Sequence, residues 1–169
     1  MLEKMFGAKG FQSILLKLED DLPLLLINLH AVAGGFWDPE SESVETVRHE
    51  QFEEVLRVIG GSQEHPVVVV GDFNAGPKVS ECNYAQFLEA GFTDCFGDTD
   101  EPAYTWDPKN ALIGQGPHAE CPPQRIDHIF ARNIDSISDS HICFHEATLP
   151  LASSPGTLVP ISDHYGLVS

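Results

Sequence analysis

Apolar runs of strand length recur along this chain and end in polar residues or turns. Phe11–Leu18 and Leu24–His30 are two such runs, and the second ends in a polar residue, as a buried strand does when its end reaches a cleft. The four valines Val67–Val70 predict a buried central strand. Further strands are predicted at Phe92–Phe96, Tyr104–Trp106, Arg125–Ala131, Ile137–Glu146 and Ser162–Val168.

Two helices are predicted between these strands. Apolar residues share one face of Val44–Ile59, and a glycine pair follows that segment and ends the helix. A shorter helix is predicted at Asn83–Ala90. The segments Asp107–Gln124 and Ala147–Pro160 are expected to be long loops. Strands with helices between them indicate an α/β layered fold.

The composition suits a single globular domain with a strong acidic excess. The chain has 169 residues, of which 42% are hydrophobic. Nine Lys and Arg residues face 26 Asp and Glu residues, for a formal net charge of −17. Because nucleic-acid binders depend on Lys and Arg contacts to phosphate, this balance weighs against a non-specific nucleic-acid binder, and also against adhesion to anionic membranes. It does not exclude a metal ion that supplies positive charge.

The cysteines and the N-terminal residues add little to this picture. The four cysteines form no CxxC pair and are too sparse for a disulfide scaffold, so we expect reduced, partly buried thiols, with a single disulfide as the alternative. The chain has no apolar leader and no apolar run near the length of about 20 residues that a membrane span needs. We therefore expect a soluble chain, cytoplasmic rather than secreted.

Polar residues suited to catalysis stand at the ends of the predicted strands. They are His30, Asp72, Asn74, Asp127, Asp163 and His164. Any one of them alone would more often be structural, as a satisfied histidine or as an aspartate that caps a turn. Strand ends converge on one edge of a layered sheet, however, and such a group would be costly to bury without compensation. A divalent metal ion with a phosphate ester would compensate it.

Neighbouring polar residues are interpreted as structural. Strand alternation places His128 on the opposite face from Asp127, so we expect a structural role for it. A pair between Asp127 and Arg125 is the structural alternative to a catalytic role of that aspartate. Surface or loop positions are expected for His49, His65, His118, His141 and His145.

Four strings in chain order resemble motifs of the endonuclease/exonuclease/phosphatase superfamily. They are Asn28-Leu29-His30, Val70-Gly71-Asp72-Phe73-Asn74, Arg125-Ile126-Asp127-His128-Ile129 and Ser162-Asp163-His164. The second and fourth together are a much stronger signal than either alone, and the match covers almost the whole chain. The superfamily includes magnesium-dependent nucleases, inositol-phosphate phosphatases and neutral sphingomyelinases. The resemblance implies an α/β fold, a four-layer β-sandwich flanked by helices, and a metal-dependent phosphodiesterase.

The resemblance also implies a role for each residue of these strings. His164 is implied as the general base that takes a proton from water, and Asp127 as the carboxylate that orients it. Asp163 and Asp72 are implied at the metal site, where Asp72 would also position the attacking water. The implied donors to the scissile phosphate are Asn74 and His30. The implied cofactor is Mg²⁺, with Mn²⁺ as a substitute.

The resemblance further implies a segment upstream of Phe11 that has no counterpart here. In the superfamily, strands before this point supply an Asn and a metal-binding Glu, whereas Glu3 lies too close to Phe11 to replace that Glu. We therefore expect residues 1–169 to form about the C-terminal two thirds of a single such domain. An N-terminally incomplete domain would expose sheet edges.

The segment Tyr104–Asn110, followed by Cys121–Asp127, looks like the sphingomyelinase-type branch of the superfamily. Trp106 and Lys109 are therefore candidate substrate contacts, although Trp106 could instead pack beneath the loop and Lys109 could be solvated. The acidic charge favours a small phosphodiester or a zwitterionic lipid head group over nucleic acid. The alternatives are a metal-dependent nuclease of the same fold and a truncated, non-catalytic domain.

Overall fold

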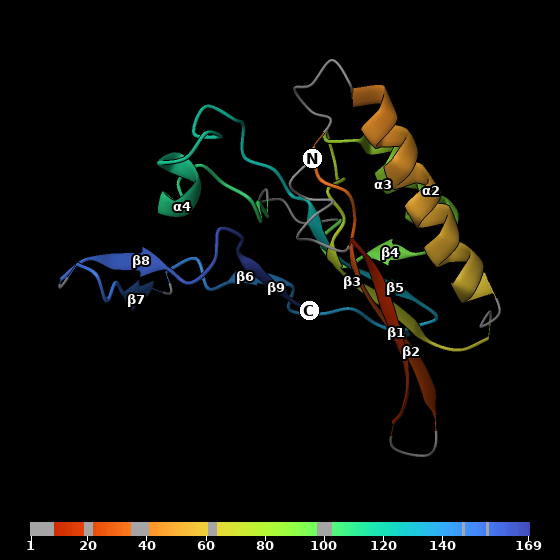
Figure 1. The fold of residues 1–169 in the computed structure, drawn as a ribbon. Coiled ribbons are helices and arrows are strands. Elements are labelled where there is room, and N and C mark those ends of the chain that lie inside the picture. The colour runs from red at the N-terminus through yellow and green to blue at the C-terminus, as the bar shows by residue number, and fades with distance from the viewer. Residues whose placement is uncertain are drawn as a thin grey trace.

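The chain folds around one mixed sheet in a computed structural model that describes residues 9–18, 22–34, 41–60, 64–97, 103–146, 148–154 and 156–169 (Figure 1). The elements in chain order are β1 (Gly10–Lys17), β2 (Pro23–His30), α2 (Ser41–Ile59), β3 (Val67–Asp72), α3 (Glu81–Glu89), β4 (Thr93–Asp94), α4 (Ala111–Gly114), β5 (Asp127–Arg132), β6 (His141–Cys143), β7 (Thr148–Pro150), β8 (Leu158–Pro160) and β9 (Gly166–Val168).

Five strands form the main sheet, in the order β1-β2-β3-β5-β4. β2 and β3 run parallel with α2 as the crossover between them, and the other neighbouring strands are antiparallel. The valine run is the middle strand, as predicted. The register places His30 beside Asp72, and Asp72 beside Asp127. Three of the predicted site residues therefore come from adjacent strand ends.

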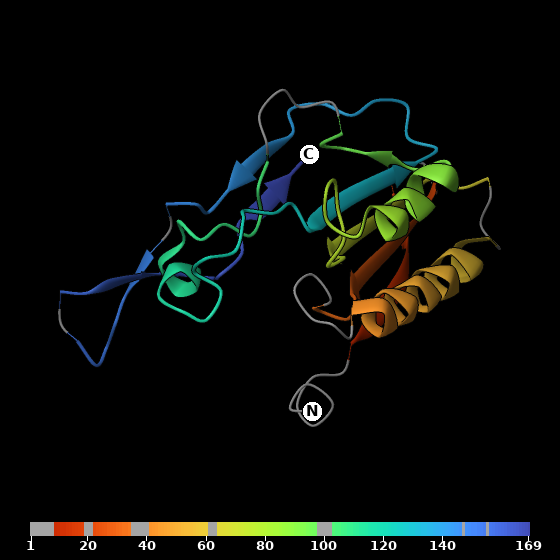
Figure 2. The ribbon, with the colours of Figure 1, turned by 90° about the horizontal axis from the view of Figure 1, so that it is seen from above.

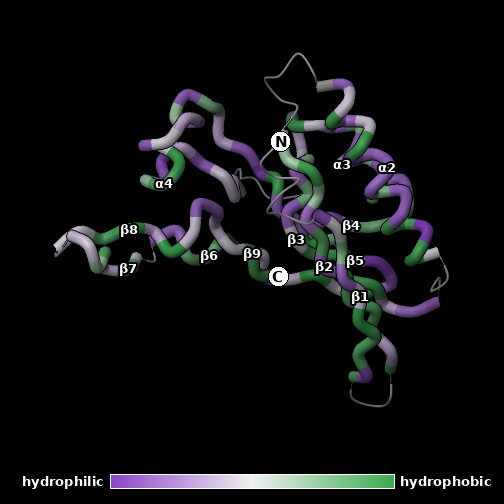
Figure 3. Tube along the Cα trace, viewed as in Figure 1, coloured by the Kyte–Doolittle hydropathy of each residue, from purple (hydrophilic) through white to green (hydrophobic). Residues whose placement is uncertain are grey.

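The two longer helices, α2 and α3, cover the same face of this sheet (Figure 2). Between them and the sheet lie the fully buried rings of Phe52, Phe73, Phe87 and Phe130, with neighbouring centroids 5.0 to 5.7 Å apart. Figure 3 shows hydrophobic residues concentrated on the strands, while α2 is largely hydrophilic outside its buried positions. Burial of each such side chain contributes about 1.5–3 kcal/mol, so this cluster holds α2 and α3 against β5 and the residue that follows β3.

Both predicted helices are confirmed with shifted ends. α2 starts at Ser41 rather than Val44, and α3 spans Glu81–Glu89 rather than Asn83–Ala90. The first turn of α2 contains the acidic Glu42, which suits a helix N-terminus but adds nothing to the apolar period. The predicted start was therefore too late.

Four predicted strands are wrong in type or length. The strand expected over Phe92–Phe96 is reduced to β4, two residues long, and the strand expected over Ser162–Val168 is reduced to β9, three residues long. The Tyr104–Trp106 segment forms no strand, and Trp106 instead makes isolated bridges to Gln124 and to His164. The strand expected over Ile137–Glu146 is reduced to β6, three residues long. Apolar residues in a short peripheral segment do not specify how far its backbone pairing extends.

Two predicted loops contain regular structure. The Asp107–Gln124 segment includes the short helix α4, and the Ala147–Pro160 segment forms the β7–β8 hairpin. Every residue of β7 is exposed, so this hairpin lacks the alternating burial pattern that identifies a strand in a sequence.

The mixed α/β class of the fold is confirmed. Besides the main sheet, β6 pairs with β9, which contacts β5, and the β7–β8 hairpin extends away from the main sheet (Figures 1 and 2). Within the residues described, no helix combines the length and apolar character needed to cross a membrane. The four cysteines are free thiols, as expected, and three of them are partly buried, whereas Cys82 is exposed.

Candidate active site

The ends of β2 and β3 bring His30 and Asp72 together. His30 Nε2 lies 3.2 Å from Asp72 Oδ2, and the ammonium group of Lys9 contacts the same imidazole nitrogen. The backbone N–H of Asn74 donates to Asp72 Oδ1 at 2.9 Å, with Asn74 in the left-handed conformation at φ 49°. Asparagine tolerates this conformation better than most residues, which explains the sharp turn directly after the strand.

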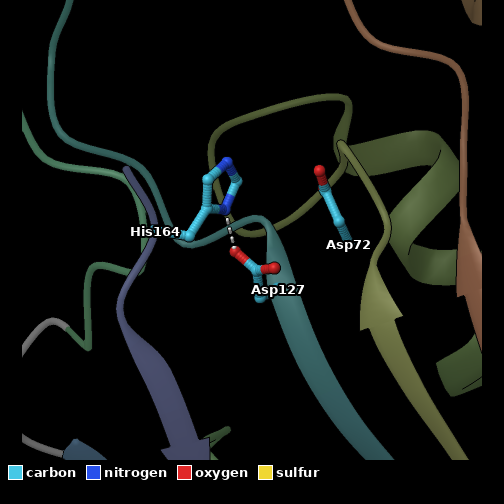
Figure 4. A group of neighbouring side chains, drawn as sticks. All are labelled: Asp72, Asp127 and His164. Atoms are coloured by element: carbon cyan, nitrogen blue, oxygen red, sulfur yellow. Dashed lines mark hydrogen bonds and ion pairs between the residues drawn. The ribbon is translucent and has the colours of Figure 1, made fainter. Parts of the chain in front are cut away.

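Asp127 and His164 form a hydrogen-bonded pair opposite Asp72. His164 Nδ1 lies 2.7 Å from Asp127 Oδ2, and Asp72 faces the imidazole from the neighbouring strand end (Figure 4). An ionised carboxylate only accepts hydrogen bonds, so Nδ1 carries the proton and donates it to Asp127. This leaves Nε2 of a neutral imidazole as the nitrogen that can accept a proton.

Thr105 holds the start of β5 in place. Its hydroxyl Oγ1 accepts the backbone N–H groups of Ile126 and Asp127, each at 3.2 Å, and its side chain is fully buried. Its carbonyl accepts the N–H of Tyr165 at 2.7 Å. The Tyr104–Asn110 segment, which contains the candidate substrate contact Trp106, therefore also positions both members of the Asp127–His164 pair.

A second contact fixes the segment that carries His164. The buried Asn110 donates from Nδ2 to the carbonyl of Ser162 at 2.8 Å, and Ser162 Oγ accepts the N–H of His164 at 3.1 Å. Trp106 bridges to the backbone of His164. The last histidine of the chain is thus held against β5 by a loop some 50 residues earlier in the sequence.

The electrostatics of the group favour a bound positive charge. Burial and the nearby charge of Asp127 raise the pKa of Asp72, against the opposing effect of His164, the Asn74 N–H and His30. Burial opposes protonation of His164, but the hydrogen bond and charge of Asp127, with the charges of Asp72 and Asp163, raise its pKa to about 9. Two carboxylates at such close range repel each other, and a cation between them relieves that repulsion.

The carboxylates of Asp72 and Asp127 in this group fit a divalent metal ion of the Mg²⁺ type. Ligand atoms of Asp72, Asp127 and His164 all lie within 4.8 Å of one another. Carboxylate oxygens are the ligands that Mg²⁺ prefers. Asp163, also assigned to the metal by resemblance, is exposed and is not part of this compact group, although it lines the same cavity.

One cavity of about 660 Å³ joins all six residues predicted at strand ends. Trp106 lines it too, whereas Lys109 is exposed and is not among its lining residues. The wall also includes Gln124 and His118, which sequence analysis did not assign to a site. The His118 ring meets Trp106 edge-on, with centroids 6.0 Å apart. Only its place in the long loop next to Trp106 could have indicated His118.

Behind this cavity lies a buried polar cluster centred on Asp94. His128 Nδ1 and Arg125 Nη2 each lie 3.2 Å from Asp94 Oδ2, and His128 Nε2 lies 2.9 Å from the carbonyl of Ala75. Burial alone would raise the pKa of Asp94, but the contacts to His128 and Arg125 hold it below the ordinary value. Arg125 therefore pairs with Asp94, and His128 is buried away from the cavity, in agreement with its predicted structural role.

A family model described as the endonuclease/exonuclease/phosphatase family matches residues 10–164. This confirms the resemblance seen in the sequence motifs. A search of curated proteins finds no match.

Several solved structures share the fold at low identity. The structure of SmcL matches with 20% identity and a TM-score of 0.72, covering 94% of this chain and 57% of that one. Beta toxin from Staphylococcus aureus, a double mutant with bound magnesium ions, matches with 17% identity and a TM-score of 0.63, covering 94% and 56%. An endonuclease/exonuclease/phosphatase from Beutenbergia cavernae matches with 18% identity and a TM-score of 0.64, covering 93% and 37%. The chain thus spans about half the length of these structures, or less.

Proposed function

The chain belongs to the endonuclease/exonuclease/phosphatase family, and from this premise we propose that it hydrolyses phosphodiesters with water as the nucleophile. The observation that carries the proposal is the Asp127–His164 pair, which meets Asp72 in an open cavity. Asp127 accepts the Nδ1 proton of the imidazole, so Nε2 of the neutral ring is left to take a proton from water. Asp72 is then placed to orient that water.

Asn74 and His30 are the proposed partners of the scissile phosphate. Both line the cavity beside Asp72, and their side chains can donate hydrogen bonds to developing negative charge on phosphate oxygens. Mg²⁺ is the proposed cofactor, with Mn²⁺ as a substitute, held by Asp72 with Asp163 on the same wall. Bound there, it supplies positive charge that polarises the phosphate and favours the neutral form of His164.

The proposed substrate is a small phosphodiester or a zwitterionic lipid head group of the sphingomyelin type. The net charge of −17 repels a long polyanion but exerts no net force on a head group without net charge. Trp106, on the cavity wall, is the proposed aromatic contact for such a group. A nuclease of the same fold is the second candidate, because that activity uses the same residues.

The test is hydrolysis of a chromogenic phosphodiester with Mg²⁺ and with EDTA. We expect EDTA to abolish turnover and His164→Ala to lower kcat by about 10²–10⁴-fold, the usual contribution of a general base. His49→Ala is the matched control, because His49 is an exposed histidine on α2 whose ion pair is with Glu53 on the same helix. Turnover that neither EDTA nor His164→Ala changes would contradict the proposal.

The substrate class is tested by comparing sphingomyelin vesicles with supercoiled plasmid. Lipid turnover without nicking supports the proposed sphingomyelinase-like activity, and nicking without lipid turnover supports the nuclease alternative. A chain that melts cooperatively but hydrolyses none of the three substrates supports the non-catalytic alternative.

A further inference from the structure

A fully buried arginine, Arg48 on α2, lies outside the catalytic group described above. Each of its five N–H groups has an acceptor. Nε and Nη2 donate to the carbonyl of Val32 at 3.3 and 3.0 Å, and Nη2 also donates to the carbonyl of Gly34 at 2.8 Å. Nη1 donates to Glu45 Oε1 at 2.7 Å and to Ser80 Oγ at 3.0 Å. Removing a charged group from water is costly even when it is paired. A role that only this forked donor can fill would explain its place here.

The two carbonyls belong to the segment that leaves β2 directly after His30. The same segment receives a second contact from α2, because the N–H of Val32 donates to Gln51 Oε1 at 2.9 Å. Buried backbone groups need partners, and here helix side chains supply the partners that a neighbouring strand would supply elsewhere. Ala33 and Gly34 in this segment line the catalytic cavity.

The opposite side of the guanidinium reaches the turn beyond β3. Ser80 donates to Glu45, and Asn83 Nδ2 donates to Glu45 Oε2 at 2.8 Å and to the Glu45 carbonyl at 3.1 Å. Ser80 has the left-handed conformation, with φ 53°, just before α3. One polar cluster therefore joins the loops that follow β2 and β3, the two strands that end in His30 and Asp72.

We propose that Arg48 is a positioning residue of the hydrolytic site, which fixes the carbonyls of Val32 and Gly34 and so holds His30 and the adjoining cavity wall in place. This inference rests on the proposed phosphodiesterase function. Lysine cannot replace the guanidinium, because an ammonium group has three donors at one point and cannot bridge carbonyls and a carboxylate in a fixed fork.

The test compares Arg48→Lys with Arg57→Lys on the same helix. Arg57 is exposed and pairs with Glu54 across one turn, so its exchange controls for the loss of an arginine from α2. Turnover of the chromogenic phosphodiester with Mg²⁺ is measured at a temperature well below the melting temperatures of both variants. It is expressed per folded molecule. We expect kcat of Arg48→Lys to fall by about 10–100-fold, the size of effect that an ångström-scale misplacement has, with a smaller change in KM. Arg57→Lys should keep the wild-type kcat.

Backbone NMR separates positioning from mere stability. In Arg48→Lys, the amide signals of residues 31–34 should shift and exchange faster with solvent than in Arg57→Lys. Gln51→Leu, which removes the other contact to Val32 without a charge change, should shift the same signals and lower kcat by a smaller factor. If Arg48→Lys does not fold, kcat and the amide signals of residues 31–34 are both measured on Gln51→Leu.

Unchanged amide signals overturn the proposal, whatever the activity. A lower melting temperature with an unchanged kcat per folded molecule overturns it as well, because Arg48 would then only stabilise the fold. Wild-type activity is measured first, so a wild-type chain without turnover is recognised separately; it overturns the proposed function and, with it, the hydrolytic role of Arg48.

Discussion

The Asp127–His164 pair sets the protonation state of the imidazole. Asp127 accepts from His164 Nδ1 at 2.7 Å, while the Asp127 backbone is held by the buried Thr105 hydroxyl. Burial of the imidazole favours its neutral form, and the carboxylate outweighs burial, so the pKa of His164 rises to about 9. Without a cation, the imidazole is therefore charged at neutral pH and cannot accept a proton. A divalent ion at Asp72 would shift it toward the neutral base that hydrolysis needs.

Asp127→Asn should lower the pKa of His164 below about 9, because burial then acts on the ring against only the charges of Asp72 and Asp163. The raised pKa means that the imidazolium stabilises the wild-type fold; this contribution is complete below pH 6.5 and is lost as pH rises through about 9. The measurement is an NMR titration of the His164 ring in EDTA, with Asp135→Asn as the exposed control. A variant whose His164 still titrates near 9 would contradict the assigned cause.

Asp72→Asn should raise the melting temperature at pH 7 in EDTA while it abolishes Mg²⁺-dependent turnover. Burial and the charge of Asp127 raise the pKa of Asp72, so its ionised form destabilises the metal-free fold above the ordinary carboxyl pKa. The neutral amide removes this penalty and can still accept the Asn74 N–H. Added Mg²⁺ should stabilise the wild-type chain and not the variant. Thermal unfolding with and without Mg²⁺ checks this, and a less stable metal-free variant would be the contrary result.

Residues that end buried strands could be predicted from the sequence, and residues that act through the backbone could not. His30 and Asp72 follow unmistakable apolar runs, so their meeting at one sheet edge was predictable. Arg48 interrupts no pattern, and its acceptors on the segment after β2 are backbone carbonyls, which every residue has. Gln124 on the cavity wall likewise stands in a loop without periodicity. Only the folded backbone reveals such residues.

At the scale of elements, the site depends on the close approach of two parallel strands. Gly71 on β3 lies beside Leu29 on β2 and has φ +131°. A Cβ atom on Gly71 would lie 2.0 Å from the Leu29 carbonyl oxygen. The next residue along each strand is a site residue, His30 and Asp72, so any separation of the strands here would move both.

Gly71→Ala should therefore destabilise the fold by about 3 kcal/mol or more, through backbone strain and the clash with the β2 carbonyl. Gly10→Ala is the control, since Gly10 lies on the edge strand β1 and a Cβ there meets nothing within 4 Å. Chemical denaturation of both variants gives the comparison. Equal stability of the two variants would show that β2 and β3 can separate at little cost.

Strands with one buried face were predicted well, whereas peripheral elements were not. Val67–Val70 and Leu24–His30 have the apolar density that only a covered sheet explains, and they became β3 and β2. The β7–β8 hairpin has no buried residue on β7 and so no alternation to detect. Its pairing depends on local turn geometry rather than on a core, and its sequence of small residues and prolines resembled a loop.

At the scale of the whole molecule, a chain with a large acidic excess carries the proposed cation site. The formal net charge is −17, and the group of Asp72 and Asp127 adds to the local negative field rather than relieving it. An anionic phosphodiester therefore approaches against the field of the protein until a cation occupies the site. The strength of this electrostatic repulsion depends on the charge of the substrate. The salt dependence of turnover therefore tests the preference for a small or zwitterionic substrate.

Raising the salt concentration from about 50 mM to about 500 mM should speed plasmid nicking relative to hydrolysis of a zwitterionic phosphocholine diester, because salt screens the repulsion between two polyanions. We expect kcat/KM for plasmid to rise several-fold and that for the zwitterion to change less than about twofold. Mg²⁺ is kept saturating at each salt concentration, so that screening of the metal site does not mask the effect. A basic nuclease surface would give the opposite slope, since its phosphate contacts weaken with salt. Plasmid nicking that falls with salt would mean that a local basic surface outweighs the net charge, and the preference for a small or zwitterionic substrate would lose its electrostatic basis.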